Sequence, residues 1–423
     1  MSRTRGIILA VALLATLLNL VNLLPAYFSA RTARTAFYDF RLWRSAVERY
    51  AETGTLYDLE TPGYFDPGSH SLYKYPPLFA TLLMPFAGVP QRVVGPVFFS
   101  FYLVVLGAAF ALLIAALRPG PWKAAWMGLA LINWQPIWET MSDLQMEMLI
   151  LALVAACGLA LGRGRRALAG LPLGVAGALK VYPWALLAFL AARARWRALA
   201  GAAAGAILAL ALTLLAFPAE LSRQFFFDIL PKLGGTSLSY ENLSLLGFFG
   251  RILAEVASGT SGAAAFDTLV LERLQPGWVG PAAYAAWIIA GGAAVYLFAR
   301  RMRRWQREGV PGTDIVGLAG AVCLLLLFIP SSWISYQALL ALPVLVLLAR
   351  SDERALWRRP AAYLALAPGL LLNGYGRIFA AMPAVVSLVR AAVPVLLLYL
   401  LAAAPRTQAG GTQAGPVPAR QRG

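Results

Sequence analysis

The chain has 423 residues, of which 60% are hydrophobic and 13% are charged, and its formal net charge is +17 at pH 7. Soluble globular domains are nearer half apolar and a quarter charged, so this composition excludes an ordinary soluble protein. Apolar stretches long enough to span a bilayer recur from end to end, with the basic residues clustered between them. We therefore predict an all-α, polytopic membrane protein whose positive charge sets its topology and does not bind nucleic acid.

The chain begins with an apolar stretch at 7–24, preceded by Arg3 and Arg5. No clean cleavage site follows this stretch, so we predict an uncleaved first span and not a signal peptide. The positive-inside rule assigns the later basic clusters to the cytoplasm. These clusters lie at 163–166, 193–197, 300–307 and 350–359, and in the C-terminal tail.

This assignment predicts a helix bundle of about 10–12 membrane segments. We predict that the bundle forms a single domain over 1–404 and that residues 405–423 form a disordered cytoplasmic tail. After the first span, the predicted spans cover 96–117, 123–139, 145–162, 198–217, 278–299, 313–330, 335–349, 360–374 and 383–404.

Two segments do not have the pattern of simple crossings. Residues 77–90 are short and carry prolines near both ends, which predicts a re-entrant or interfacial segment. Residues 167–192 have basic clusters at both ends, which favours a hairpin of two short helices broken at "LKVYP". A single ordinary span that violates the charge rule is the alternative for 167–192.

Two long loops, 25–76 and 218–277, face the outside on this map and hold most of the acids. In the first loop, residues 36–52 lack glycine and proline and predict a helix that lies along the outer membrane surface. At roughly 100° per residue, one face of that helix is apolar and the other is polar. The apolar face collects Phe40, Leu42, Trp43, Ala46, Val47 and Tyr50, and the polar face collects Arg41, Arg44, Ser45, Glu48, Arg49 and Glu52.

Asp39 falls in the middle of the apolar face, one turn before Trp43. An ionised carboxylate costs several kcal/mol on such a face unless something there requires it. One explanation is a helix cap, because an acid near a helix N-terminus satisfies free amide groups. The other is a functional acid aimed at a cavity beneath the helix, where desolvation raises its proton affinity and suits it to act as a general base.

Two lysines stand in unusual positions. Lys74, in "YKYPPL", has the length to reach lipid headgroups or to hold a phosphate. Lys180 lies midway through an apolar run, where a cation needs an anionic partner. Lys180 therefore belongs either to a functional site or to a structural ion pair.

Further polar and aromatic residues gather at the predicted outer ends of the spans and in the outer loops. They are Tyr38, Tyr75, Gln145, Glu147, Tyr182, Glu241, Asn242, Arg251, Trp333, Tyr336, Gln337 and Arg377. Individually these residues are typical of interfacial belts, loop ends or helix caps. Together they converge on the outer face.

The order of these motifs resembles the C-type glycosyltransferase superfamily, and specifically glycosyltransferase family 87. The resemblance rests on "FYDF", "GTLYD" and "YKYPPL", then "LKVYP" in mid-chain, then "ENLSLLGFFGR". It covers most of residues 5–400. Two places depart from the family pattern, since "LQME" (144–147) stands where relatives often have Gly-Gln-x-Asn, and "SYQ" (335–337) where some mannosyltransferases have a histidine.

The resemblance implies a polyprenyl-phosphate-linked sugar as donor, mannose by family default, and a lipid or glycan acceptor hydroxyl outside the cytoplasm. It implies that Asp39 is the base on the acceptor. The leaving phosphate requires a cation, for which Lys74, Lys180, Arg251 and Arg377 are candidates. One base and direct displacement would invert the anomeric carbon. The other residues gathered on the outer face are candidates for substrate binding.

No metal cofactor is indicated, because His70 is the only histidine and Cys157 and Cys323 both lie within apolar runs. A divalent cation bridging Asp39 and the donor phosphate is the alternative. We expect the enzyme in the plasma membrane, with its site extracytoplasmic and its C-terminus cytoplasmic. The rival hypothesis is a transporter or flippase, which a broken helix and an intramembrane lysine also suit.

Overall fold

A computed structural model describes residues 37–65, 72–233, 235–259, 269–310, 312–350 and 383–403, with a few single positions elsewhere. Helices and the loops between them make up the described ranges, in which the β-structure is one isolated bridge between Ser237 and Val270. Three described helices, α4 (Gln91–Leu117), α10 (Trp196–Leu214) and α14 (Val279–Arg307), are long and apolar enough to cross a membrane. The predicted fold class, an all-α membrane bundle, is confirmed. The predictions for 360–374, Arg377 and the tail lie outside the described residues, as does most of 7–24.

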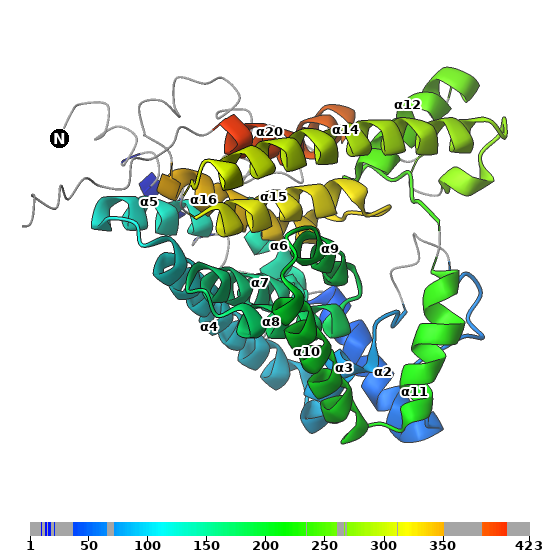
Figure 1. Ribbon diagram of the computed structural model, residues 1–423. Coiled ribbons are helices and arrows are strands. Elements are labelled where there is room, and N and C mark those ends of the chain that lie inside the picture. Colours follow the sequence, from blue (N-terminus) through cyan, green and yellow to red (C-terminus); the bar gives the residue numbers. More distant parts are fainter. Residues whose placement is uncertain are drawn as a thin grey trace, which may run out of the picture.

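Further helices complete the bundle (Figure 1). They are α5 (Pro121–Ile132), α6 (Gln135–Asp143), α7 (Glu147–Gly162), α8 (Arg166–Leu179), α9 (Leu186–Ala192), α15 (Thr313–Phe328), the 3₁₀-helix η6 (Ile334–Leu340), α16 (Ala341–Arg350) and α20 (Pro383–Ala403). Helix α7 packs against α4, α8 and α15, while α15 also packs against α14, α16 and α20. One predicted span differs, because 123–139 is divided between α5 and α6. Pro136 in the first turn of α6 lacks the amide that would continue α5.

The basic loops lie together at one end of the bundle. Arg193 and Arg195, between α9 and α10, pair with Asp314 at the start of α15 over 2.7 and 2.6 Å. Lys123, near the start of α5, donates a hydrogen bond to the carbonyl of Ala349 at the end of α16. Arg301 donates likewise to Ala402 at the end of α20. The opposite end therefore carries the starts of α4, α7 and α14 and the end of α8.

Residues 167–192 form the predicted hairpin. A Cβ atom on Gly170 would lie 1.6 Å from the carbonyl oxygen of Ala198, and one on Gly174 would lie 2.0 Å from that of Ala202. Helices α8 and α10 are therefore in backbone contact, and the matching order of these contacts shows that they run parallel. Because both begin at the basic end, the intervening segment must return to that end. Trp184 on the returning leg donates a hydrogen bond to the carbonyl of Gly174.

The segment 77–90 is also not a crossing. It forms α3 (Pro77–Leu83) and the single turn η1 (Met84–Phe86), which together are too short to span a bilayer. Helix α3 packs against α2 (Tyr38–Thr53), α8 and α10. The second of the predicted outer loops, 218–277, contains α11 (Ala219–Arg223), the π-helix η3 (Gln224–Ile229), η4 (Leu230–Lys232), α12 (Leu245–Ser258) and η5 (Leu271–Arg273).

The helix predicted over 36–52 is α2, and its apolar face is buried as expected. Phe40 and Trp43 are at most 1% exposed. Phe40 packs against Phe98 of α4, with ring centroids 4.7 Å apart, which fixes α2 across the start of that helix. Arg44 differs from the prediction because it is buried on the polar side. Its guanidinium donates to Gln91 on α4 and to Glu48, which compensates the burial.

Candidate active site

A buried ion pair lies at the end of the bundle opposite the basic loops. Lys180 stands at the turn of the hairpin, directly after α8, and Glu147 is the first residue of α7. Their Nζ and Oε1 atoms are 2.5 Å apart, and their side chains are 6% and 0% exposed. The intramembrane lysine therefore has the anionic partner that its position requires.

Three tyrosine rings surround the ammonium of Lys180. Its Nζ lies 4.1 Å from the ring centroid of Tyr336, 5.2 Å from that of Tyr75 and 5.9 Å from that of Tyr182. The rings of Tyr182 and Tyr336 are stacked, with centroids 4.9 Å apart. Each such contact stabilises the cation through the negative face of the ring. The fold thus brings together five residues that the sequence analysis selected from four separate segments.

Asp39 lies beside this cluster, in the first turn of α2. Its neighbour Trp43 meets the ring of Tyr75 edge-on at 5.6 Å, and Tyr75 in turn faces Lys180. Burial raises the pKa of Asp39 to about 6, while Lys180 lowers it and Glu147 raises it by smaller amounts. Within the described part of the chain, no hydrogen bond or ion pair holds its carboxylate.

The helix-cap explanation for Asp39 has no support in the geometry. The N-cap position of α2 is Phe37, in the left-handed conformation, and no side chain caps the helix there. Asp39 still benefits from the helix dipole.

Asp143 is a second acid at this end, which the sequence analysis missed. It ends α6, in the turn before α7, and it is half-buried. Burial raises its pKa to about 7, with further contributions from Asp39, Glu139 and Glu241. Two carboxyl groups with raised pKa values in one place are characteristic of functional sites. The only signal in the sequence was its position between two apolar segments, two residues before Gln145.

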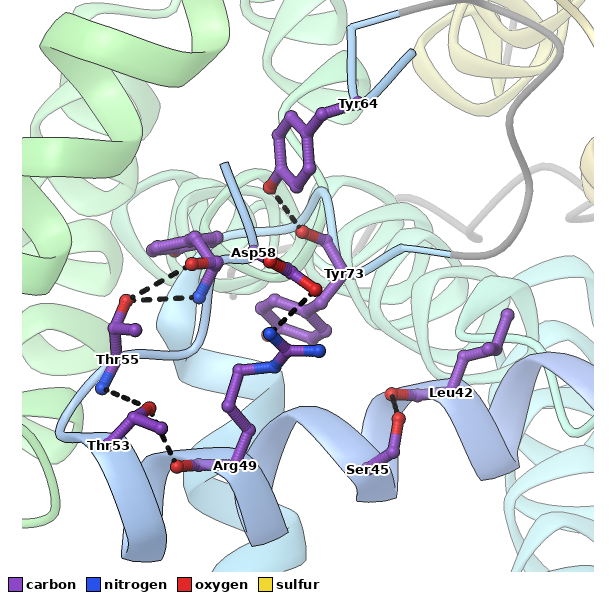
Figure 2. A network of polar contacts seen from close by, with 9 residues as sticks. Leu42, Ser45, Arg49, Thr53, Thr55, Asp58, Tyr64 and Tyr73 are labelled. Atoms are coloured by element: carbon purple, nitrogen blue, oxygen red, sulfur yellow. Dashed lines mark hydrogen bonds and ion pairs between the residues drawn. The ribbon is translucent and has the colours of Figure 1, made fainter. Parts of the chain in front are cut away.

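The loop that carries Lys74 and Tyr75 is held by its own polar network (Figure 2). Arg49 on α2 pairs with Asp58 at 2.6 Å, and Tyr64 donates to the carbonyl of Tyr73 at 2.5 Å. Tyr57 donates to the carbonyl of Tyr75 at 3.1 Å. These contacts fix the position of Tyr75 against Trp43 and Lys180.

Arg251 and Asn242 belong to a different network. Arg251 is buried and donates to the carbonyls of Ser239 and Asn242 over 2.9 and 3.0 Å. The side chain of Asn242 donates to the carbonyl of Pro330 and accepts from the amide of Ser332. The network ties the start of α12 to the end of α15. Phosphate binding by Arg251 stays a prediction, and its guanidinium is already engaged.

The remaining predicted site residues have varied surroundings. Gln145 and Gln337 are buried, Trp333 is half-buried and Glu241 is exposed. The Nζ of Lys74 lies 5.8 Å from the ring centroid of Tyr64. The side chain of Tyr38 lies outside the described residues, as does Arg377.

Several buried polar atoms near the ion pair lack a hydrogen-bond partner. They are Oε2 of Glu147, Oε1 of Gln145 and the hydroxyl oxygens of Tyr102 and Tyr182. Each unpaired buried group costs about 1–3 kcal/mol, so a concentration of them needs a reason. A site that must meet a polar substrate supplies that reason. Across the described ranges, no three histidine, cysteine, aspartate or glutamate side chains are arranged to hold a metal ion.

A helix bundle with acids, a shielded lysine and tyrosines gathered at one end of its helices defines an integral membrane protein with a polar site at that end. The model of glycosyltransferase family 87 matches residues 73–330. This is more than half of the chain, so the chain belongs to that family and is a membrane glycosyltransferase. No curated protein matches the chain.

Family membership favours the transferase over the transporter hypothesis. The matched residues include Tyr75, Asp143, Glu147 and Lys180. Asp39 precedes the match, so its role is argued from its own surroundings.

Proposed function

We propose that this glycosyltransferase moves a sugar, mannose by our expectation, from a polyprenyl-phosphate donor to a hydroxyl of a lipid or glycan acceptor. Transfer takes place at the extracytoplasmic face of the plasma membrane and inverts the anomeric carbon. The observation that carries the proposal is the half-buried carboxylate of Asp39, unpaired among the described residues and with its pKa raised to about 6.

A general base works best when its pKa lies near the working pH. At pH 7 a carboxyl with a pKa of about 6 is mostly ionised, yet it is a stronger base than an ordinary aspartate. Asp39 is therefore suited to take the proton of the acceptor hydroxyl as that oxygen attacks the sugar. If Asp39 is the base and the acceptor oxygen displaces the phosphate directly, the anomeric carbon is inverted.

The donor phosphate must be met by a cation as its negative charge develops. Lys74 adjoins Tyr75, which contacts both Trp43 beside Asp39 and Lys180. This position makes Lys74 our choice for the phosphate, with Arg377 as a further candidate. We expect no divalent ion to be needed, so transfer should persist when a chelator such as EDTA is present.

The orientation follows from the basic loops. Because cytoplasmic loops are rich in lysine and arginine, the end with Arg193, Arg195 and Arg301 is proposed to be cytoplasmic. The end of α20 lies beside Arg301, which is consistent with a cytoplasmic C-terminus. A Glu52→Cys variant should then react with an impermeant maleimide added outside whole cells. Cys157 and Cys323 are fully buried and should not react with the maleimide.

The function is tested with membranes that contain the protein and a labelled sugar donor. We expect label from polyprenyl-phosphate mannose, and not from a nucleotide sugar, to enter lipid or glycan acceptors. Asp39→Asn should lower transfer by about 10²–10⁴-fold, the usual contribution of a general base. Glu52→Gln, an exposed acid on the same helix, is the matched control and should leave transfer unchanged. Undiminished transfer by Asp39→Asn would refute the role of Asp39.

A further inference from the structure

The Glu147–Lys180 pair is sealed inside the protein, and burial makes it expensive. Its two side chains are 0% and 6% exposed, and Oε2 of Glu147 has no hydrogen-bond partner. Buried ion pairs often contribute no more stability than well-packed apolar residues of the same size. Stability alone therefore does not account for a pair placed here.

The pair lies within reach of Asp39. The ring of Tyr75 contacts Trp43, one turn from Asp39, on one side and Lys180 on the other. Among charged groups, Lys180 acts most strongly on the Asp39 carboxyl and Glu147 acts next, with opposite sign. A lysine alone at this position would hold Asp39 firmly ionised and make it a poor proton acceptor.

The other groups near Asp39 do not take over the opposing effects of Lys180 and Glu147 on its carboxyl group. Tyr75 and Tyr336 are neutral. Asp143 at the end of α6 interacts electrostatically with Asp39, and Glu139 and Glu241 in turn act on Asp143. On α2 itself, Arg41 and Arg44 occupy the polar face, and Arg44 is paired with Glu48. From α4, the neutral Gln91 faces Arg44.

We infer that Glu147 and Lys180 are positioning residues that form a neutral unit beside Asp39. Lys180 gathers three tyrosine rings beside the base, and Glu147 cancels its charge so that Asp39 keeps the basicity needed to accept a proton. This inference rests on the proposed function of Asp39. It also separates Lys180 from the phosphate-binding role that its sequence position suggested, because its charge is already compensated.

The test is the pH dependence of kcat/KM for sugar transfer, measured for wild type and variants. Glu147→Gln leaves the Lys180 ammonium uncompensated, which lowers the pKa of Asp39. The acid limb of the profile, the fall of kcat/KM at low pH as Asp39 gains its proton, should therefore move to lower pH by about one unit. The double variant Glu147→Gln/Lys180→Met is neutral again and should return the limb to its wild-type position, even if kcat falls. Asp314→Asn, at the opposite end, is the control and should leave the limb in place.

The inference is overturned if the acid limb of Glu147→Gln stays in place or moves to higher pH. It is also overturned if the double variant does not return the acid limb to its wild-type position. If Glu147→Gln fails to fold, Lys180→Met replaces it. That variant leaves the Glu147 carboxylate uncompensated and should move the acid limb to higher pH, and an unmoved limb would overturn the inference. The proposed function fails separately, when Asp39→Asn retains full transfer. Loss of transfer in Asp39→Asn with an unmoved limb in Glu147→Gln would remove only the inference.

Discussion

Two partly buried acids at opposite ends of the bundle, Asp314 and Asp39, differ in their pairing. At the basic end, Asp314 accepts hydrogen bonds from Arg193 and Arg195 over 2.7 and 2.6 Å. At the other end, Asp39 lies half-buried without a hydrogen bond to any described residue, and its pKa is raised to about 6. An acid that is paired with two arginines holds helices together, whereas an unpaired buried acid keeps a raised pKa, which is characteristic of functional sites. On the proposed function, this difference separates a structural acid, Asp314, from a catalytic one, Asp39.

The largest expected difference between Asp314 and Asp39 is in thermal stability when each acid is replaced in turn. Asp314→Asn leaves two largely buried arginines without their anion, so the free energy of unfolding should fall by about 2 kcal/mol. Asp39→Asn removes a carboxylate that burial disfavours, so the melting temperature should not fall. The measurement is thermal unfolding in detergent. A large loss of stability in Asp39→Asn would mean that Asp39 is structural.

A smaller effect is expected at Asp143. Its pKa is raised to about 7 partly by Asp39, so the two carboxyl groups should titrate as a coupled pair. Asp143→Asn should reduce transfer by about tenfold or less and simplify the acid limb of the pH–rate profile to one step. A loss as large as that of Asp39→Asn would exchange the roles of the two acids.

The smallest effect is expected at the aromatic enclosure of Lys180. Tyr336→Leu removes the closest ring and should cost about 0.5–2 kcal/mol of stability, the worth of a cation–π contact. Tyr336→Phe keeps the ring and removes only the hydroxyl, which also interacts with Lys180, so its loss should be smaller than that of Tyr336→Leu. Equal losses in the two variants would show that the hydroxyl, and not the ring, matters there.

Local patterns predicted much of this molecule. The period of α2 placed Asp39 on the buried face, and basic clusters at both ends of 167–192 predicted the hairpin. Lys180 was recognisable because a lone cation in an apolar run demands a partner. These features depend on residues close together in the chain.

Long-range contacts were beyond the same reasoning. Glu147 and Lys180 are 33 residues apart, and only the fold shows that they pair with each other. The sequence does not show that Arg251 donates to the carbonyls of Ser239 and Asn242, because Asn242 is held by Pro330 and Ser332, which lie far along the chain. Asp143 looked like an ordinary turn acid, since nothing near it in the sequence reports its burial.

The most direct test of the account is the pH dependence of kcat/KM for sugar transfer by wild type and by Asp39→Asn. Since burial raises the pKa of Asp39, activity should fall as pH drops through about 6, where the carboxylate gains its proton. The residual activity of Asp39→Asn should lack that fall. An unchanged acid limb in Asp39→Asn would show that another group is the base and would contradict the account.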